Sequence, residues 1–150
     1  MQKASIPHDA LVFVGDGTRG VFLRNHGTIQ KPNLAVESVL QQHNPPNSEQ
    51  GTDRPGRVHA RMGPSRSAVE DTDWHQLAQD RFASEISQAL YRLAHANRFQ
   101  RLIVVAPPKI LGTLRKNFHK QVRERLEAEV AKEVATHHLN DIVRELASWW

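Results

Sequence analysis

The feature that most constrains the fold is a short apolar run followed directly by two prolines. Residues 102–106 read Leu-Ile-Val-Val-Ala, which is typical of a strand covered on both faces. Pro107 and Pro108 end that strand, since proline has no N–H for a central ladder, but proline suits the first turn of a helix. Apolar residues then recur at helical spacing at Ile110, Leu111, Leu114 and Phe118. The sequence therefore predicts a buried strand running into a helix, as in α/β proteins.

The first third of the chain predicts three more strands. Residues 10–14 are apolar, and the Gly15-Asp16-Gly17 sequence that follows indicates a hairpin, because glycine accepts the positive φ of tight turns. Residues 20–24 supply the returning strand. Residues 34–41 alternate in part, with apolar side chains at Leu34, Val36 and Val39, and predict a third strand near an edge of the sheet. Together they predict an antiparallel meander.

A long amphipathic helix is predicted from Asp73 to about Asn97. Asp73 is suited to the N-cap position, and Gln76 follows at the spacing of a capping box. The apolar residues then form one stripe along the helix: Trp74, Leu77, Ala78, Phe82, Ile86, Leu90, Leu93 and Ala94.

The pattern of residues 119–135 fits either a helix or a strand. Apolar residues recur there at helical spacing, but Leu126, Ala128 and Val130 also alternate with glutamates. Alternation of strands and helices favours a short helix to Arg125 and then an edge strand over residues 126–132. A final helix is predicted over residues 139–148.

The predicted order is β-β-β-α-β-α-β-α within 150 residues, enough for one domain with its own core. With right-handed crossovers, this order predicts a mixed five-stranded sheet, strand order 3-2-1-4-5, with helices on both faces. That is an α/β fold of the ribonuclease-H-like arrangement.

Composition excludes several classes of protein. There is no cysteine, hence no disulfide framework, and the nine histidines are scattered without the spacing of a zinc site. No apolar run approaches the ~20 residues of a membrane span. The first residues lack the apolar core of a secretion signal. We expect a cytoplasmic protein that needs no metal or cofactor and does not contact the membrane.

Residues 43–73 differ from the rest in being rich in proline and glycine, and they predict a long flexible loop. The loop carries Arg54, Arg57, Arg61 and Arg66, whose forked N–H donors suit phosphate oxygens. Four such contacts would give salt-sensitive RNA binding without sequence preference. The alternative is a linker-like loop with a solvated basic surface.

A hydrolytic site is the other hypothesis. A ribonuclease-H-type nuclease needs several carboxylates around two metal ions near the strand ends. Asp16 follows the first strand, and Asp53 and Gly56 lie in the loop, so these three residues form a possible strand-end and loop site. However, the predicted central strand ends in Ala106 and prolines rather than in an acid, and Asp16 is explained more simply as a turn residue. No catalytic residue is assigned.

Three blocks of the sequence resemble the bacterial host attachment protein family: Asp-Arg-Pro-Gly-Arg at 53–57, Arg-Phe-Ala-x-Glu-Ile at 81–86, and the run from Arg101 to Arg115. The resemblance implies a protein required for attachment to host cells, acting as a surface or protein-interaction factor. It also implies kinship with the middle domain of archaeo-eukaryotic peptide-chain release factors, and so the ribosome or transfer RNA as a partner. The Gly-Gly-Gln motif with which those factors position water is absent here. The oligomeric state is left open.

Overall fold

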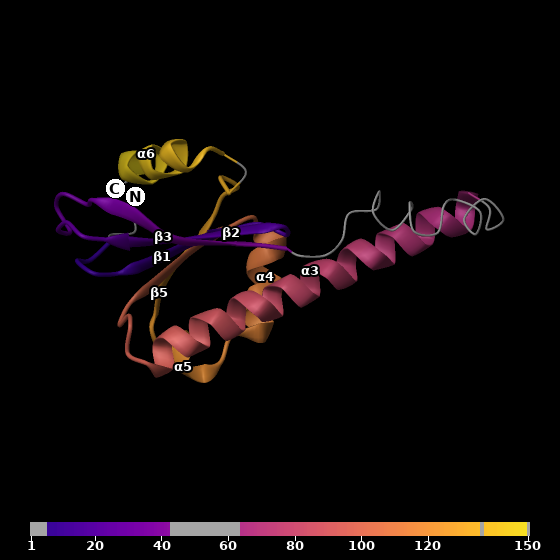
Figure 1. Ribbon diagram of the computed structural model, residues 1–150, viewed down its shortest axis with the longest axis horizontal. Coiled ribbons are helices and arrows are strands. Elements are labelled where there is room, and N and C mark those ends of the chain that lie inside the picture. The colour runs from indigo at the N-terminus through magenta and orange to yellow at the C-terminus, as the bar shows by residue number, and fades with distance from the viewer. Residues whose placement is uncertain (1–5, 43–63, 136, 150) are drawn as a thin grey trace.

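A mixed five-stranded sheet organises the molecule (Figure 1). The computed structural model describes residues 6–42, 64–135 and 137–149, and for residues 64–73 and 147–149 it describes the course of the backbone. The strands are β1 (Leu11–Gly15), β2 (Arg19–Asn25), β3 (Leu34–Gln41), β4 (Leu102–Ala106) and β5 (Leu126–Ala131). The helices are α3 (Pro64–His95), α4 (Pro108–Asn117), α5 (Lys120–Glu124) and α6 (Leu139–Trp149).

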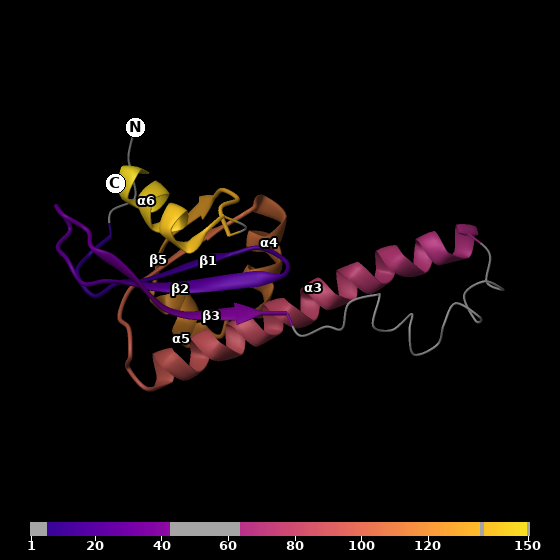
Figure 2. The ribbon, with the colours of Figure 1, turned by 45° about the horizontal axis from the view of Figure 1, so that its top comes forward.

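The strand order is β3-β2-β1-β4-β5, which confirms the predicted topology. The strands β1, β2 and β3 form the antiparallel meander, whereas β4 pairs parallel with β1 and with β5. Helices α3, α4 and α5 cover one face of the sheet and α6 covers the other (Figures 1 and 2). The segment over residues 119–135, whose pattern fits either a helix or a strand, also follows the prediction, since the short helix α5 leads into the edge strand β5.

The alternation of side chains along the central strands builds a separate core on each face. Phe13 and Val104 face α3, α4 and α5, where they pack among residues that include Phe82 and Leu114. Their neighbours Val12 and Val105 face α6. Every residue of β4 is buried. The continuous apolar run thus becomes a strand covered on both faces because its side chains alternate between two cores.

Helix α3 begins at Pro64, so the prediction that it starts at Asp73 is wrong. Proline at the first helical position is itself a start signal, and residues 65–72 contain no glycine or proline that would interrupt the helix. The first turns extend beyond the sheet (Figures 1 and 2). The apolar stripe indicates only the part of α3 that packs on a core, so it does not show where the helix begins. Leu77, which the sequence pattern placed in that stripe, is 54% exposed.

The C-terminal end of α3 is fixed by two separate devices. Asn97 adopts a positive φ of 57° and its N–H donates to the carbonyl of Ala94, in the manner of a left-handed C-cap. Arg125, which precedes β5, donates from Nη1 to the carbonyls of Ala94 (2.7 Å) and Phe99 (2.9 Å). The end of α3 is therefore held against the start of β5, close to the predicted end at Asn97.

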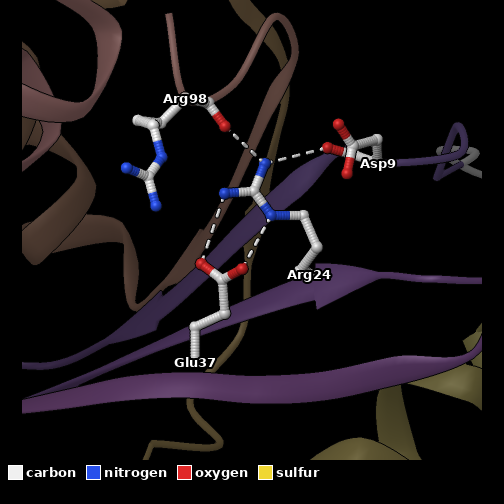
Figure 3. A network of polar contacts seen from close by, with 4 residues as sticks. All are labelled: Asp9, Arg24, Glu37 and Arg98. Carbon is white, nitrogen blue, oxygen red and sulfur yellow. Dashed lines mark hydrogen bonds and ion pairs between the residues drawn. The ribbon is translucent and has the colours of Figure 1, made fainter. Parts of the chain in front are cut away.

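A buried arginine on β2 joins four segments of the chain (Figure 3). The Arg24 side chain is 7% exposed and binds both carboxylate oxygens of Glu37 through Nε (2.9 Å) and Nη2 (3.2 Å). Its Nη1 donates to the carbonyls of Asp9 (3.1 Å) and Arg98 (2.8 Å). Glu37 lies at a β-bulge in β3, where it has no partner residue on β2. The bulge supplies the carboxylate that neutralises Arg24.

Candidate functional site

The residues predicted to bind phosphate fall mostly in one segment of the chain. Asp53, Arg54, Gly56, Arg57 and Arg61 lie outside the described residues. Arg66 lies in the first turn of α3, where only the backbone is described. The last ten residues of the predicted loop, 64–73, are helical rather than loop. Phosphate binding by these arginines stays a prediction.

Asp16 lies in the β1–β2 turn and is 8% exposed. Its Oδ1 accepts hydrogen bonds from the backbone N–H of Thr18 (2.8 Å), from the Thr18 hydroxyl (3.1 Å) and from the N–H of Arg19 (2.8 Å). This is the arrangement of an Asx turn, in which a short side chain takes the place of a backbone acceptor. Among the residues that the structure describes, no group of three or more His, Asp or Glu side chains could hold a metal ion.

Asp16→Ala is expected to lower the free energy of unfolding by about 1–2 kcal/mol, because two backbone N–H groups lose their acceptor. Asp16→Asn keeps an oxygen at the same position, so we expect it to retain most of the stability. Urea denaturation of both variants measures the difference. Equal losses in the two variants would mean that the negative charge, rather than the turn geometry, is what the fold requires.

A depression beside α6 has a volume of about 520 Å³ and is lined by His137, Asp141, Arg144 and Glu145. Its charged groups are engaged with one another: His137 Nδ1 lies 2.7 Å from Glu145, and Arg144 lies 3.3 Å from Asp141. The depression is therefore of mixed charge, with one arginine and two carboxylates, and His137 adds a positive charge only when it is protonated.

A different stretch of the chain carries the excess of positive charge. Residues 91–123 contain eight Lys or Arg and no Asp or Glu. They span the last turn of α3, the connection to β4, and helices α4 and α5, and all eight cations are exposed. Three of them meet glutamates that follow in the sequence: Lys120 meets Glu124 (3.9 Å), Arg101 meets Glu127 (3.6 Å) and Arg115 meets Glu129 (2.6 Å).

These ion pairs differ in strength. Arg115 donates from Nε to both oxygens of Glu129, and this hydrogen bond, together with the glutamate's charge, raises the pKa of Arg115. The contacts of Arg101 and Lys120 are longer and lie between exposed side chains. Exposed pairs of that kind are weak and screened by salt. The guanidinium group of Arg115 is therefore held by Glu129 on β5, whereas the positive charges of Arg101 and Lys120 stay exposed to solvent.

Aromatic rings lie within this basic surface. Tyr91 on α3 and His119 at the α4–α5 junction have ring centroids 4.1 Å apart at an angle of 36°, and His95 lies 5.6 Å from Tyr91. His119 also caps α5, since its Nδ1 accepts from the N–H of Gln121 (3.1 Å). Local sequence motifs do not reveal this surface, because its residues come from three helices. The signal that points to it in the sequence is the absence of acids over residues 91–123.

Comparison with known proteins places the chain in a family. Two similar solved structures are the archaeal translation termination factor aRF1, at a TM-score of 0.47, 12% identity and 83% coverage of this chain, and an archaeal protein at 0.47, 13% and 93%. The chain spans about a third of each structure's length, 30% and 34%. No curated protein matches, and none of the described helices is long and apolar enough to cross a membrane. A family model matches residues 9–146, and the chain therefore belongs to bacterial archaeo-eukaryotic release factor family 12.

Proposed function

We propose that this chain is a cytoplasmic release-factor-like domain that binds ribosomal or transfer RNA without hydrolysing peptidyl-tRNA. The observation that carries the proposal is the presence of four arginines and no acid within residues 54–66 of a release-factor family member. Arginine forks match phosphate oxygens, and the glycines between them allow the backbone to approach a ligand closely. Asp53 and Gly56 belong to the same proposed binding segment.

The chemistry that the chain lacks limits the proposal to binding. Release factors hydrolyse peptidyl-tRNA with a Gly-Gly-Gln motif, and no such motif occurs in this sequence. The Asx turn at Asp16 gives a structural explanation for the strand-end carboxylate of the suggested hydrolytic site, whose second carboxylate, Asp53, lies outside the described residues. Binding through phosphate contacts needs no catalytic group, so it agrees with the residues present.

Replacing Arg54, Arg57, Arg61 and Arg66 with alanine is expected to weaken sedimentation of the protein with ribosomes. Loss of four phosphate contacts would reduce the slope of log affinity against log salt by about 3. Co-sedimentation at several salt concentrations measures this slope. The matched control replaces the same four residues with lysine, which keeps the positive charge and most of the slope. Unchanged binding of the alanine variant would contradict the role of this segment.

Cell fractionation separates this proposal from the attachment role implied by the sequence resemblance. We expect the protein to be recovered with ribosomes or RNA. Recovery on the cell exterior would contradict the proposal and favour a surface or protein-interaction factor. Metal-dependent cleavage of RNA that Asp16→Asn abolishes would instead establish the nuclease hypothesis.

A further inference from the structure

We propose that the surface around the Tyr91–His119 ring pair, with Arg92, Lys116 and Lys120, binds single-stranded RNA. We call it the ring-pair surface. The inference rests on the proposed function and deepens it, because it assigns part of the RNA contact to described residues outside the arginine segment of residues 54–66. The ring pair joins the last turn of α3 to the α4–α5 junction, so the flanking cations belong to adjacent elements.

The distribution of charge along the chain favours this surface as the contact for RNA. Residues 91–131 hold nine Lys or Arg and three Glu, a net charge of +6, whereas the whole chain has a net charge of +4. The remaining residues therefore sum to −2. By contrast, residues 43–73 hold four arginines but five Asp or Glu. A polyanion that approaches the protein is attracted mainly to the surface built by residues 91–131.

The three cations are placed to reach a ligand. Arg92, Lys116 and Lys120 are exposed, and Lys120 keeps 76% of its side chain accessible beside its distant contact with Glu124. Arg123, one turn further on, donates from Nη1 to the carbonyl of Phe118 (2.6 Å), which fixes its guanidinium at the same junction. The glutamates nearby are themselves exposed and balance only part of this charge.

The rings add a contact that an arginine cluster alone lacks. Tyr91 is half-buried, whereas His119 is exposed, and only one face of the His119 ring can lie against Tyr91. The capping hydrogen bond to Nδ1 holds the ring in place and assigns the proton of the neutral imidazole to Nε2. A fixed aromatic ring among cations is the arrangement on which unpaired bases stack while the cations contact the backbone.

Single-stranded RNA fits these features better than a duplex or an acidic protein. Bases in a duplex are already stacked on each other and cannot use an exposed ring, whereas unpaired bases can. An acidic protein segment would satisfy the cations but would gain nothing from ring stacking. The ring-pair surface therefore predicts stronger binding of an unstructured oligonucleotide than of a hairpin of equal length.

The test uses the full chain and a fluorescently labelled 12-nucleotide oligouridine, with affinity measured by anisotropy between 50 and 200 mM salt. The variant changes Arg92, Lys116 and Lys120 to glutamine. The matched control changes Lys31, Arg81 and Arg144, exposed cations elsewhere, to glutamine, so that both variants lose the same charge. Three lost single-strand contacts reduce the slope of log affinity against log salt by about 2. Between 50 and 200 mM salt, the factor by which affinity falls should therefore be about 20 times larger for the unaltered protein than for the variant.

A second variant, His119→Asn, removes the ring but keeps a good N-cap for α5. It should weaken oligouridine binding about fivefold or more while leaving the salt slope unchanged, since stacking is not an ionic contact. Circular dichroism checks that each variant keeps its helical content.

The outcomes separate the two proposals. If the unaltered protein binds neither oligouridine nor ribosomes, the proposed function itself fails. If it binds RNA but the triple variant behaves as the matched control does, the ring-pair surface is not an RNA contact and the inference fails alone. A preference for the hairpin over oligouridine, or an unchanged affinity in His119→Asn, would overturn the assignment of a single strand stacked on the ring.

Discussion

Arg24→Met is expected to lower the free energy of unfolding by about 3 kcal/mol. Methionine has a similar length and fills the buried path of the side chain, so the loss reports the polar contacts rather than a cavity. Two backbone carbonyls, of Asp9 and Arg98, lose their donor, and Glu37 loses its bidentate partner (Figure 3). Removing one member of a buried ion pair typically costs about 3–5 kcal/mol, and the partial exposure of Glu37 places this case at the lower limit.

A second variant, at Glu37, separates the ion pair from the carbonyl contacts, and a third, at Arg144, is a control in which an exposed ion pair is broken. Glu37→Gln keeps an acceptor for Arg24, and the two carbonyls remain bonded, so we expect a smaller loss of about 1–2 kcal/mol. Arg144→Met breaks an exposed pair and is expected to cost less than about 0.5 kcal/mol. Chemical denaturation measures all three. A loss in Arg24→Met no larger than that in Arg144→Met would show that the buried network does not stabilise the fold.

Gly20→Ala is expected to lower the free energy of unfolding by about 2–3 kcal/mol, although it adds a single methyl group. A Cβ at this position would lie 2.6 Å from Cε1 of Phe13. The Phe13 ring is fully buried and packs edge-to-face on Phe22, with centroids 5.0 Å apart, so it has little room to move. Forcing an extra methyl group into a packed core typically costs about 1–3 kcal/mol. Gly15, the cross-strand partner of Gly20, lies against the same ring.

Gly112→Ala is the matched control for this prediction. Gly112 is inside α4, and beyond its chain neighbours and the backbone of its own helix a Cβ there would meet no atom within 4 Å. Because alanine favours the helix over glycine, we expect this variant to gain up to about 1 kcal/mol. In the double variant Gly20→Ala/Phe13→Leu, leucine leaves room for the added methyl group, so the loss in free energy of unfolding should be smaller than the sum of the losses in the two single variants. Additive losses would mean that Phe13 is not what excludes a Cβ at Gly20.

The candidate site could be predicted only in part from the sequence. Asp16 was placed correctly at the β1–β2 turn, because an Asp-Gly pair after an apolar run is a local signal. The proximity of Tyr91 and His119 was not predictable, because the two residues are 28 positions apart and meet only when α3 packs beside the α4–α5 junction. The excess of cations over residues 91–123 was visible, but the surface that it forms was not.

The sequence by itself determined the strands, the helix after Pro107 and the strand order, since apolar periodicity and proline act within a few residues along the chain. Tertiary structure decided where α3 begins, why Leu77 is exposed and why Gly20 must lack a side chain. It also decided that Glu37 meets Arg24. The physical reason is that an apolar pattern reports which residues are buried, whereas the space and the partners around a residue are set by segments distant in sequence.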